Sequence, residues 1–161
     1  MTSIGTLNSV KAFDRIIRIA KRFQEEGYHI HFQIIGEGGE EKQLKKQCCE
    51  LGVQDIVSFL GFMSNPYPYL KESDIYVSTS RSEGFSLVIC EAMCLGIPVV
   101  ATPTAGAVEL LVGYDDDSIY QGLKKLINDK QLRQQYAKKA ILHSEIFKAD
   151  EVMRKVYELF D

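Results

Sequence analysis

The chain has 161 residues, 45% of them hydrophobic and 25% charged, which is the usage of one ordinary globular domain with a real core. Its net charge of −3 gives no bulk electrostatic case for nucleic-acid binding. No apolar run approaches the roughly 18 residues of a membrane span, and the polar first twelve residues lack the apolar core of a signal peptide.

Strands and helices alternate along the first hundred residues. The predicted strands are short, apolar and β-branched, and they cover residues 2–7, 29–39 with a terminal glycine turn, 56–62, 74–80 and 97–102. The predicted helices cover residues 9–27 with Ser9 as the cap, 40–51, 65–72, 86–96, 107–112, 116–128, 130–143 and 149–160. This order predicts a Rossmann-like, doubly wound α/β domain with a parallel sheet and extra C-terminal helices.

The first long helix has two contrasting faces. Its predicted core stripe is Phe13, Ile16, Ile17, Ala20 and Phe23. A basic stripe runs opposite, through Lys11, Arg15, Arg18 and Arg22. We interpret the basic stripe as an exposed face, with contact to anionic lipid or a partner domain as the alternative.

The cysteines, histidines and aspartates give no metal site. Cys48, Cys49, Cys90 and Cys94 lack metal-ligand spacing, and we expect four reduced, mostly buried thiols in a cytoplasmic protein. His29 and His31 alternate on one strand without a third ligand. The run at 115–117 directly precedes a helix and is typical of an N-terminal cap.

Ligands of such sheets bind where the strands end, and here this predicts the loops at 7–10, 36–40, 62–65, 79–86 and 102–107. In "SRSEGFSLVICEAM" Gly84 permits close approach of a ligand, and the helix starting near Ser86 offers free amides to a phosphate. Glu83 and Glu91 are eight positions apart, about 8–12 Å by helical rise, which suits the two ends of one extended ligand. A nucleotide-sugar has this form, and two solvated surface acids are the alternative.

At this point the sequence resembles the carboxyl-terminal, donor-binding half of family-4, GT-B fold retaining glycosyltransferases. The signature is Glu, seven residues, Glu, within "SEGFSLVICEAMCLGIPVVAT". The Gly-x-Gly loop in "FQIIGEGGEEKQLKKQCCELGVQDIVSFLGF" and the start "SIGTLNSVKAFDRIIRIA" also match, so that the resemblance covers nearly the whole chain.

The resemblance implies residue roles. Glu83 would bind hydroxyls of the transferred hexose, Glu91 the ribose hydroxyls, and Lys11 the diphosphate, with Glu83 and Lys11 as the catalytic pair. Backbone amides that hold sugar and phosphate would come from Gly84, Phe85, Ser86 and Leu87. The residues flanking the nucleotide and base would be Gly36, Gly38, Phe62 and Met63, and Gly5 and Thr6 would also be donor-binding.

The sequence departs from the family pattern at several positions. Thr6 replaces a frequent arginine, Ala12 replaces the glycine of Lys-Gly, and Ala105-Gly106 replaces Gly-Gly. The segment 109–115 is shorter than usual. Phosphate binding would therefore rest more on Lys11 and the helix end.

The implied function is transfer of a hexose or N-acetylhexosamine from a nucleotide diphosphate sugar, expected to be a UDP-sugar, in bacterial surface polysaccharide (O-antigen or capsule) synthesis. No metal or other cofactor is expected. The start of the first strand directly after Met1 indicates residues 1–161 are one domain cut from a longer chain, whose amino-terminal acceptor domain is its partner. The isolated domain should bind donor without turnover. The full protein would be cytoplasmic and peripheral to the inner membrane, with a lipid-linked acceptor.

The sequence also fits other functions. A sugar-nucleotide epimerase or a stand-alone nucleotide-sugar-binding module would share fold and ligand. We interpret Tyr67, Tyr69 and Tyr76 as packing residues, and Tyr157 and Phe160 as either core or an interdomain surface.

Overall fold

The computed structural model describes residues 1–84, 86–103 and 110–145. Its parallel sheet has the strand order β3-β2-β1-β4-β5-β6. The strands are β1 (Thr2–Ile4), β2 (Phe32–Ile35), β3 (Val57–Phe59), β4 (Tyr76–Ser78), β5 (Val99–Ala101) and β6 (Leu110–Leu111). The order reverses beside β1, as in other doubly wound sheets, and the predicted Rossmann-like fold class is confirmed.

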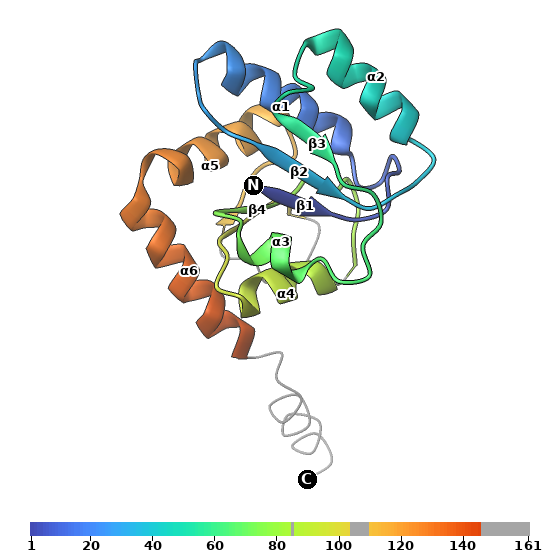
Figure 1. Ribbon diagram of the computed structural model, residues 1–161. Coiled ribbons are helices and arrows are strands. Elements are labelled where there is room, and N and C mark those ends of the chain that lie inside the picture. Colours follow the sequence, from blue (N-terminus) through green and yellow to red (C-terminus); the bar gives the residue numbers. More distant parts are fainter. Residues whose placement is uncertain (85, 104–109, 146–161) are drawn as a thin grey trace.

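Helices cover both faces of the sheet. They are α1 (Phe13–Glu25), α2 (Glu41–Leu51), α3 (Tyr67–Lys71), α4 (Leu87–Cys94), α5 (Asp116–Asn128) and α6 (Lys130–Ser144). In Figure 1, α1 and α2 lie on one side of the sheet and α3 and α4 on the other. α5 packs beside α1, and α6 contacts both α5 and α4. The predicted helix at 149–160, with Tyr157 and Phe160, lies outside the described residues.

The predicted helix at 107–112 is wrong where the structure describes it. Leu110 and Leu111 form β6 and pair in parallel with Val100 and Ala101 of β5. Val112 extends the ladder, since its N–H donates to the Ala101 carbonyl at 3.0 Å. The open edge of β5 offers unpaired backbone groups, and pairing with them outweighs the weak helical pattern of so short a segment.

The predicted start of α1 at Ser9 is also wrong. The helix begins four residues later, at Phe13, after Ala12 in the left-handed conformation (φ 54°). The Lys11 N–H donates to Asn8 Oδ1 at 3.0 Å, and Thr79 Oγ1 donates to the carbonyls of Lys11 and Ala12 at 3.1 and 3.0 Å. These bonds hold residues 8–12 as a turn, which keeps Lys11 out of the helix.

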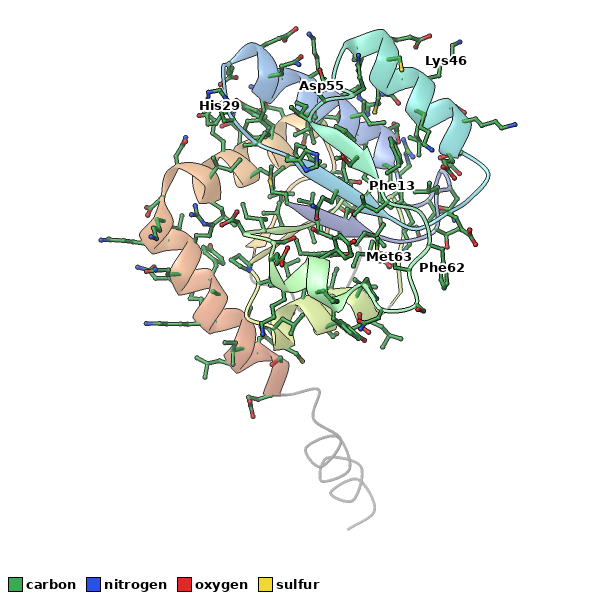
Figure 2. All side chains as sticks on the ribbon, in the orientation of Figure 1. Phe13, His29, Lys46, Asp55, Phe62 and Met63 are labelled. Carbon is green, nitrogen blue, oxygen red and sulfur yellow. The ribbon has the colours of Figure 1, made fainter. Side chains whose placement is uncertain are left out.

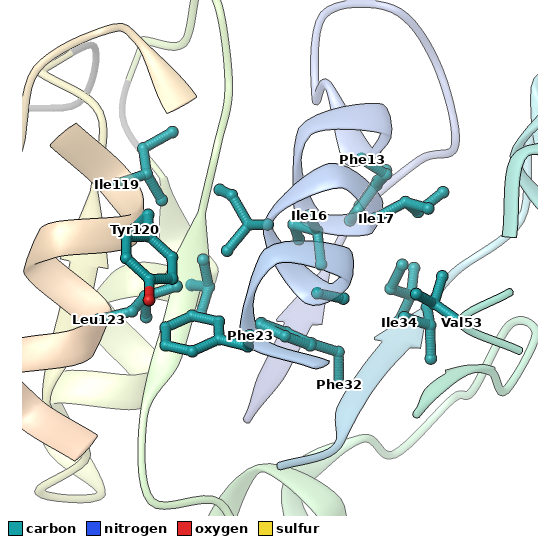
Figure 3. Close-up of a cluster of buried hydrophobic side chains, with 14 of the residues drawn as sticks. Phe13, Ile16, Ile17, Phe23, Phe32, Ile34, Val53, Ile119, Tyr120 and Leu123 are labelled. Atoms are coloured by element: carbon teal, nitrogen blue, oxygen red, sulfur yellow. The ribbon is translucent and has the colours of Figure 1, made fainter. Parts of the chain in front are cut away.

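The predicted core stripe of α1 is confirmed. Phe13, Ile16, Ile17, Ala20 and Phe23 are all buried, and they meet strand and α5 side chains in one cluster (Figure 3). A second cluster packs α3, α4 and α6 against the other face of the sheet. Buried apolar surface therefore fixes both helical layers, and the loops at the strand ends are held between them.

The predicted exposure of the basic stripe is confirmed for Arg18 but is wrong for Arg15. Arg15 is buried, and its Nε donates to Asp116 Oδ1 at 2.8 Å. Arg18 donates to Asp116 Oδ2 at 2.6 Å, and Arg22 to Asp117 at 2.5 Å. The three arginines of the stripe therefore bind the acidic first turn of α5.

The remaining side-chain predictions have mixed outcomes. Asp115 is the N-cap of α5, accepting from the Ser118 N–H at 2.8 Å, which confirms that prediction. All four cysteines are free, but Cys49 and Cys94 are exposed, so the expectation of mostly buried thiols is wrong. Burial raises the pKa of the Cys48 thiol to about 11. Within the described residues no three His, Cys, Asp or Glu side chains are grouped to hold a metal ion.

Candidate functional site

A pocket opens where β1 and β2 end. It has a volume of about 400 Å³ and is lined by Ile4, Gly5, Thr6, Ile35, Gly36, Glu37, Phe62 and Met63. Of the residues predicted to flank the nucleotide, all but Gly38 line this pocket, and so do the other two predicted donor-binding residues of the first loop. Figure 2 shows Phe62 and Met63 at this end of the sheet and His29 at the opposite end. Parallel strands thus bring three separate loops to one edge, as the sequence analysis expects.

Two glycines allow the first two of these loops to touch. Gly36 has φ 137°, and a Cβ there would lie 2.0 Å from the Gly5 carbonyl oxygen. At Gly38 a Cβ would lie 2.4 Å from the Leu7 carbonyl oxygen. Both contacts are with backbone, which cannot move aside cheaply. Gly38 therefore shapes the site by loop packing and does not line the pocket.

Next to the pocket, Lys11 and Glu83 form an ion pair. Lys11 Nζ donates to Glu83 Oε1, and Ser80 Oγ donates to Glu83 Oε2 at 2.9 Å. The Glu83 side chain is 11% exposed and that of Lys11 27% exposed. Thr102 Oγ1 supports this arrangement by donating to the Ser80 carbonyl at 2.6 Å. Both predicted catalytic residues are thus brought together, and each holds the other.

The N-terminus of α4 follows directly after Glu83. Ser86 is the buried N-cap residue, and its hydroxyl makes no capping hydrogen bond within the described residues. The amides of the first turn therefore keep their positive partial charge for an outside acceptor. Gly84 is exposed with open space around its Cα, and Leu87 is 68% exposed. Phe85, the remaining predicted amide donor, lies outside the described residues.

Glu91 lies one turn into α4 and is half-buried. Its Oε1 accepts a hydrogen bond from the Tyr67 hydroxyl at 3.0 Å. This bond raises the pKa of Tyr67, because the carboxylate stabilises the protonated phenol.

Sequence reasoning missed two residues that hold the acids. Ser80 precedes Glu83 by three positions, and its place at the end of a strand could have drawn attention to it. Tyr67 comes from a different element than Glu91, and no sequence pattern joins them.

The packing prediction is confirmed for Tyr76, which is buried, but it is wrong for Tyr67 and Tyr69, which are 46% and 39% exposed.

Together these features suit one extended polar ligand with an anionic middle. A pocket large enough for a nucleoside base adjoins a cation and a helix N-terminus that favour phosphate. An acid lies on each side of that helix end. None of the helices in the described part of the chain has the length and hydropathy needed to cross a lipid bilayer.

Comparisons with known proteins place this arrangement in context. The chain is 30% identical over 162 residues to N-acetylgalactosamine-N,N'-diacetylbacillosaminyl-diphospho-undecaprenol 4-alpha-N-acetylgalactosaminyltransferase of Campylobacter jejuni, covering 94% of this chain and 44% of that one. An uncharacterised glycosyltransferase of Haemophilus influenzae is 29% identical, with 95% and 46% covered. The chain therefore spans less than half the length of these relatives.

Among solved structures, Anabaena HepE in complex with UDP and glucose superposes with a TM-score of 0.87 at 25% identity. The match covers 99% of this chain and 47% of HepE. The sequence model of the family described as glycosyl transferases group 1 matches residues 1–143. The predicted resemblance to a carboxyl-terminal GT-B glycosyltransferase domain is confirmed, and the chain belongs to the group 1 glycosyltransferases.

Proposed function

We propose that this chain is the donor-binding domain of a retaining glycosyltransferase that uses a UDP-sugar. One observation carries the proposal: a base-sized pocket, a lysine, a helix N-terminus and two acids meet at one edge of the sheet. The transferred group would be a hexose or N-acetylhexosamine, and the acceptor a hydroxyl group. The amino-terminal acceptor domain of a longer chain would supply the other wall of the cleft.

The diphosphate would be bound by Lys11 and the first amides of α4. As the bond from the sugar to the diphosphate breaks, negative charge grows on the diphosphate. Donors already in place to meet that charge stabilise the transition state by several kcal/mol. Thr6 cannot supply the charge of the arginine that it replaces, so Lys11 takes a larger share.

Glu83 would orient the sugar, and Glu91 would accept from the ribose hydroxyls. In the absence of donor, Lys11 and Glu83 satisfy one another. A bound nucleotide-sugar would replace that ion pair by two better-matched contacts, phosphate on Lys11 and sugar hydroxyls on Glu83. The ion pair thus gives each partly buried charge an opposite charge as its neighbour until the donor binds.

The relatives support the choice of donor and acceptor. HepE was solved with UDP and glucose, and the name of the Campylobacter enzyme gives an alpha-linked N-acetylgalactosamine and a diphospho-undecaprenol acceptor. By analogy we propose a lipid-linked acceptor in surface polysaccharide synthesis, with the full protein in the cytoplasm at the inner membrane face. We also propose that no metal takes part, because Lys11 and the helix end supply the positive charge.

The test is calorimetry of the chain with UDP, GDP, ADP and their sugars, with EDTA present throughout. Glu91→Ala should weaken UDP and UDP-sugar alike, by about 10- to 100-fold, as expected for hydrogen bonds to a charged group. Glu83→Ala should weaken only the UDP-sugar, because it removes the contact with the sugar hydroxyls while Lys11 can still bind the phosphates. Negligible effects of both changes would contradict these roles, and binding that disappears in EDTA would contradict the metal-free site.

A further inference from the structure

Tyr67 is an exposed tyrosine whose hydroxyl contacts a candidate ligand-binding acid. Its ring is not part of either core cluster, and it is 46% exposed. Its hydroxyl donates to Glu91 Oε1 at 3.0 Å across the gap between α3 and α4. Packing therefore does not explain this side chain.

The position of Tyr67 is itself fixed. Its N–H donates to Asn65 Oδ1 at 3.2 Å, and Pro66 and Pro68 on either side restrict the backbone. Leu70, one turn later, is fully buried and anchors α3 to the sheet. A phenol on so constrained a backbone is a suitable support for a flexible neighbour.

Glu91 needs such a support if it is to bind hydroxyl groups. A flexible glutamate side chain loses rotamer freedom when a ligand orders it, and this loss weakens binding. An ionised carboxylate offers about four acceptor positions. Tyr67 uses one of them on Oε1, and no side chain of the described residues binds Oε2. The contact therefore restrains the carboxylate while preserving its capacity for a pair of neighbouring hydroxyls.

We propose that Tyr67 is a positioning residue that orients the Glu91 carboxylate toward the ribose 2′- and 3′-hydroxyls of the donor. This inference rests on the proposed function. It also links two parts of the site, because the segment that carries Tyr67 begins with Phe62 and Met63 of the base pocket. Recognition of base and ribose would then depend on one connection between β3 and α3.

The test compares UDP with 2′,3′-dideoxyuridine diphosphate, which lacks the hydroxyls that Glu91 would bind. In calorimetry, Tyr67→Phe should raise the Kd for UDP about fivefold, the usual effect of one hydrogen bond. It should leave the Kd for the dideoxy probe unchanged. In a Glu91→Ala background the same change should have no further effect on UDP. Tyr69→Phe, an exposed tyrosine on the same helix, is the matched control and should change neither Kd.

A second measurement does not depend on nucleotide. The Tyr67 pKa is raised by its hydrogen bond to Glu91, so Glu91→Gln should lower it when the ring is titrated by NMR. The proposal would be overturned if Glu91→Gln left the Tyr67 pKa unchanged. It would also be overturned if Tyr67→Phe left the Kd for UDP unchanged, weakened both probes equally, or still weakened UDP in the Glu91→Ala background. Failure of wild-type protein to bind any nucleotide, with the titration as expected, would instead overturn the proposed function and leave only the contact.

Discussion

Gly36 stands where no other residue fits, and it gives the sharpest prediction at the scale of single residues. In Gly36→Ala the new Cβ would lie 2.0 Å from the Gly5 carbonyl oxygen, at a φ of 137° that side chains rarely adopt. Clash and backbone strain together should cost about 3 kcal/mol or more. We expect a fall in melting temperature of about 6–12 °C, measured by circular dichroism, and a loss of UDP binding.

The matched control is Gly39→Ala, in the same loop. Nothing lies within 4 Å of a Cβ at Gly39, and its φ is not in the left-handed range. This change should alter neither the melting temperature by more than about 2 °C nor the Kd for UDP. Equal effects of the two substitutions would show that the loop does not depend on close approach at Gly36.

At the residue scale, local spacing reveals only part of the site. Glu83 and Glu91 belong to one strand–turn–helix segment, so their relation can be read from the sequence. Tyr67 and Ser80 act through side-chain contacts that depend on how α3, β4 and α4 pack, and no spacing encodes them. The pairing of Lys11 with Glu83 joins residues 72 positions apart and is likewise a product of the fold.

At the scale of elements, the contact between α1 and α5 is unusually ionic. Asp116 accepts from both Arg15 and Arg18, and Arg22 lies 3.7 Å over the ring of Tyr120. Burial tends to raise the pKa of Asp116, but the two arginine hydrogen bonds and charges outweigh it and hold the pKa below its usual value. The carboxylate therefore stabilises the docking of α5.

Asp116→Asn should lower the free energy of unfolding at pH 7 by about 2 kcal/mol. Breaking a buried ion pair costs about 3–5 kcal/mol, and the value is reduced here because the Asp116 side chain is 36% exposed. A depressed folded pKa contributes stability above the unfolded pKa of about 4 and loses it as pH falls through the folded value. Urea titrations should therefore show the difference between variant and wild type shrinking below about pH 4.

Glu50→Gln provides the comparison for this effect. Glu50 pairs with Lys46, labelled in Figure 2, and the two side chains are 61% and 77% exposed. An exposed pair of this kind contributes about 0–1 kcal/mol. If Glu50→Gln destabilised the protein as much as Asp116→Asn, burial of Arg15 would not be the source of the stability.

Elements set by local sequence can be predicted, whereas elements set by tertiary contacts cannot. Hydrophobic period and glycine positions predict α2 to within a residue, because Gly52 ends it in a left-handed conformation. They fail for β6, which exists only because β5 has an open edge. They also fail for the start of α1. Ser9 was expected to cap this helix, but hydrogen bonds between the backbone and the side chains of Asn8 and Thr79 hold the segment as a turn.

At the scale of the whole molecule, the described residues assigned to the donor lie at one edge of one sheet. Transfer also requires an acceptor hydroxyl placed against the sugar, and water kept away from it. We expect that a single open edge meets neither requirement. The relatives are more than twice as long as this chain, which agrees with a second wall of the cleft supplied by another domain.

We therefore predict that residues 1–161 bind a UDP-sugar without consuming it. The ¹H NMR spectrum of the donor should stay unchanged over hours of incubation with the chain alone, while the Kd from calorimetry shows the site occupied. A longer protein that includes the acceptor domain should release UDP only when acceptor is added. If either form changed the configuration of the sugar without acceptor, the protein would be an epimerase. The product would then still be a UDP-sugar, and no free UDP would accumulate. Transfer by residues 1–161 alone would show that this one edge is enough to hold both substrates.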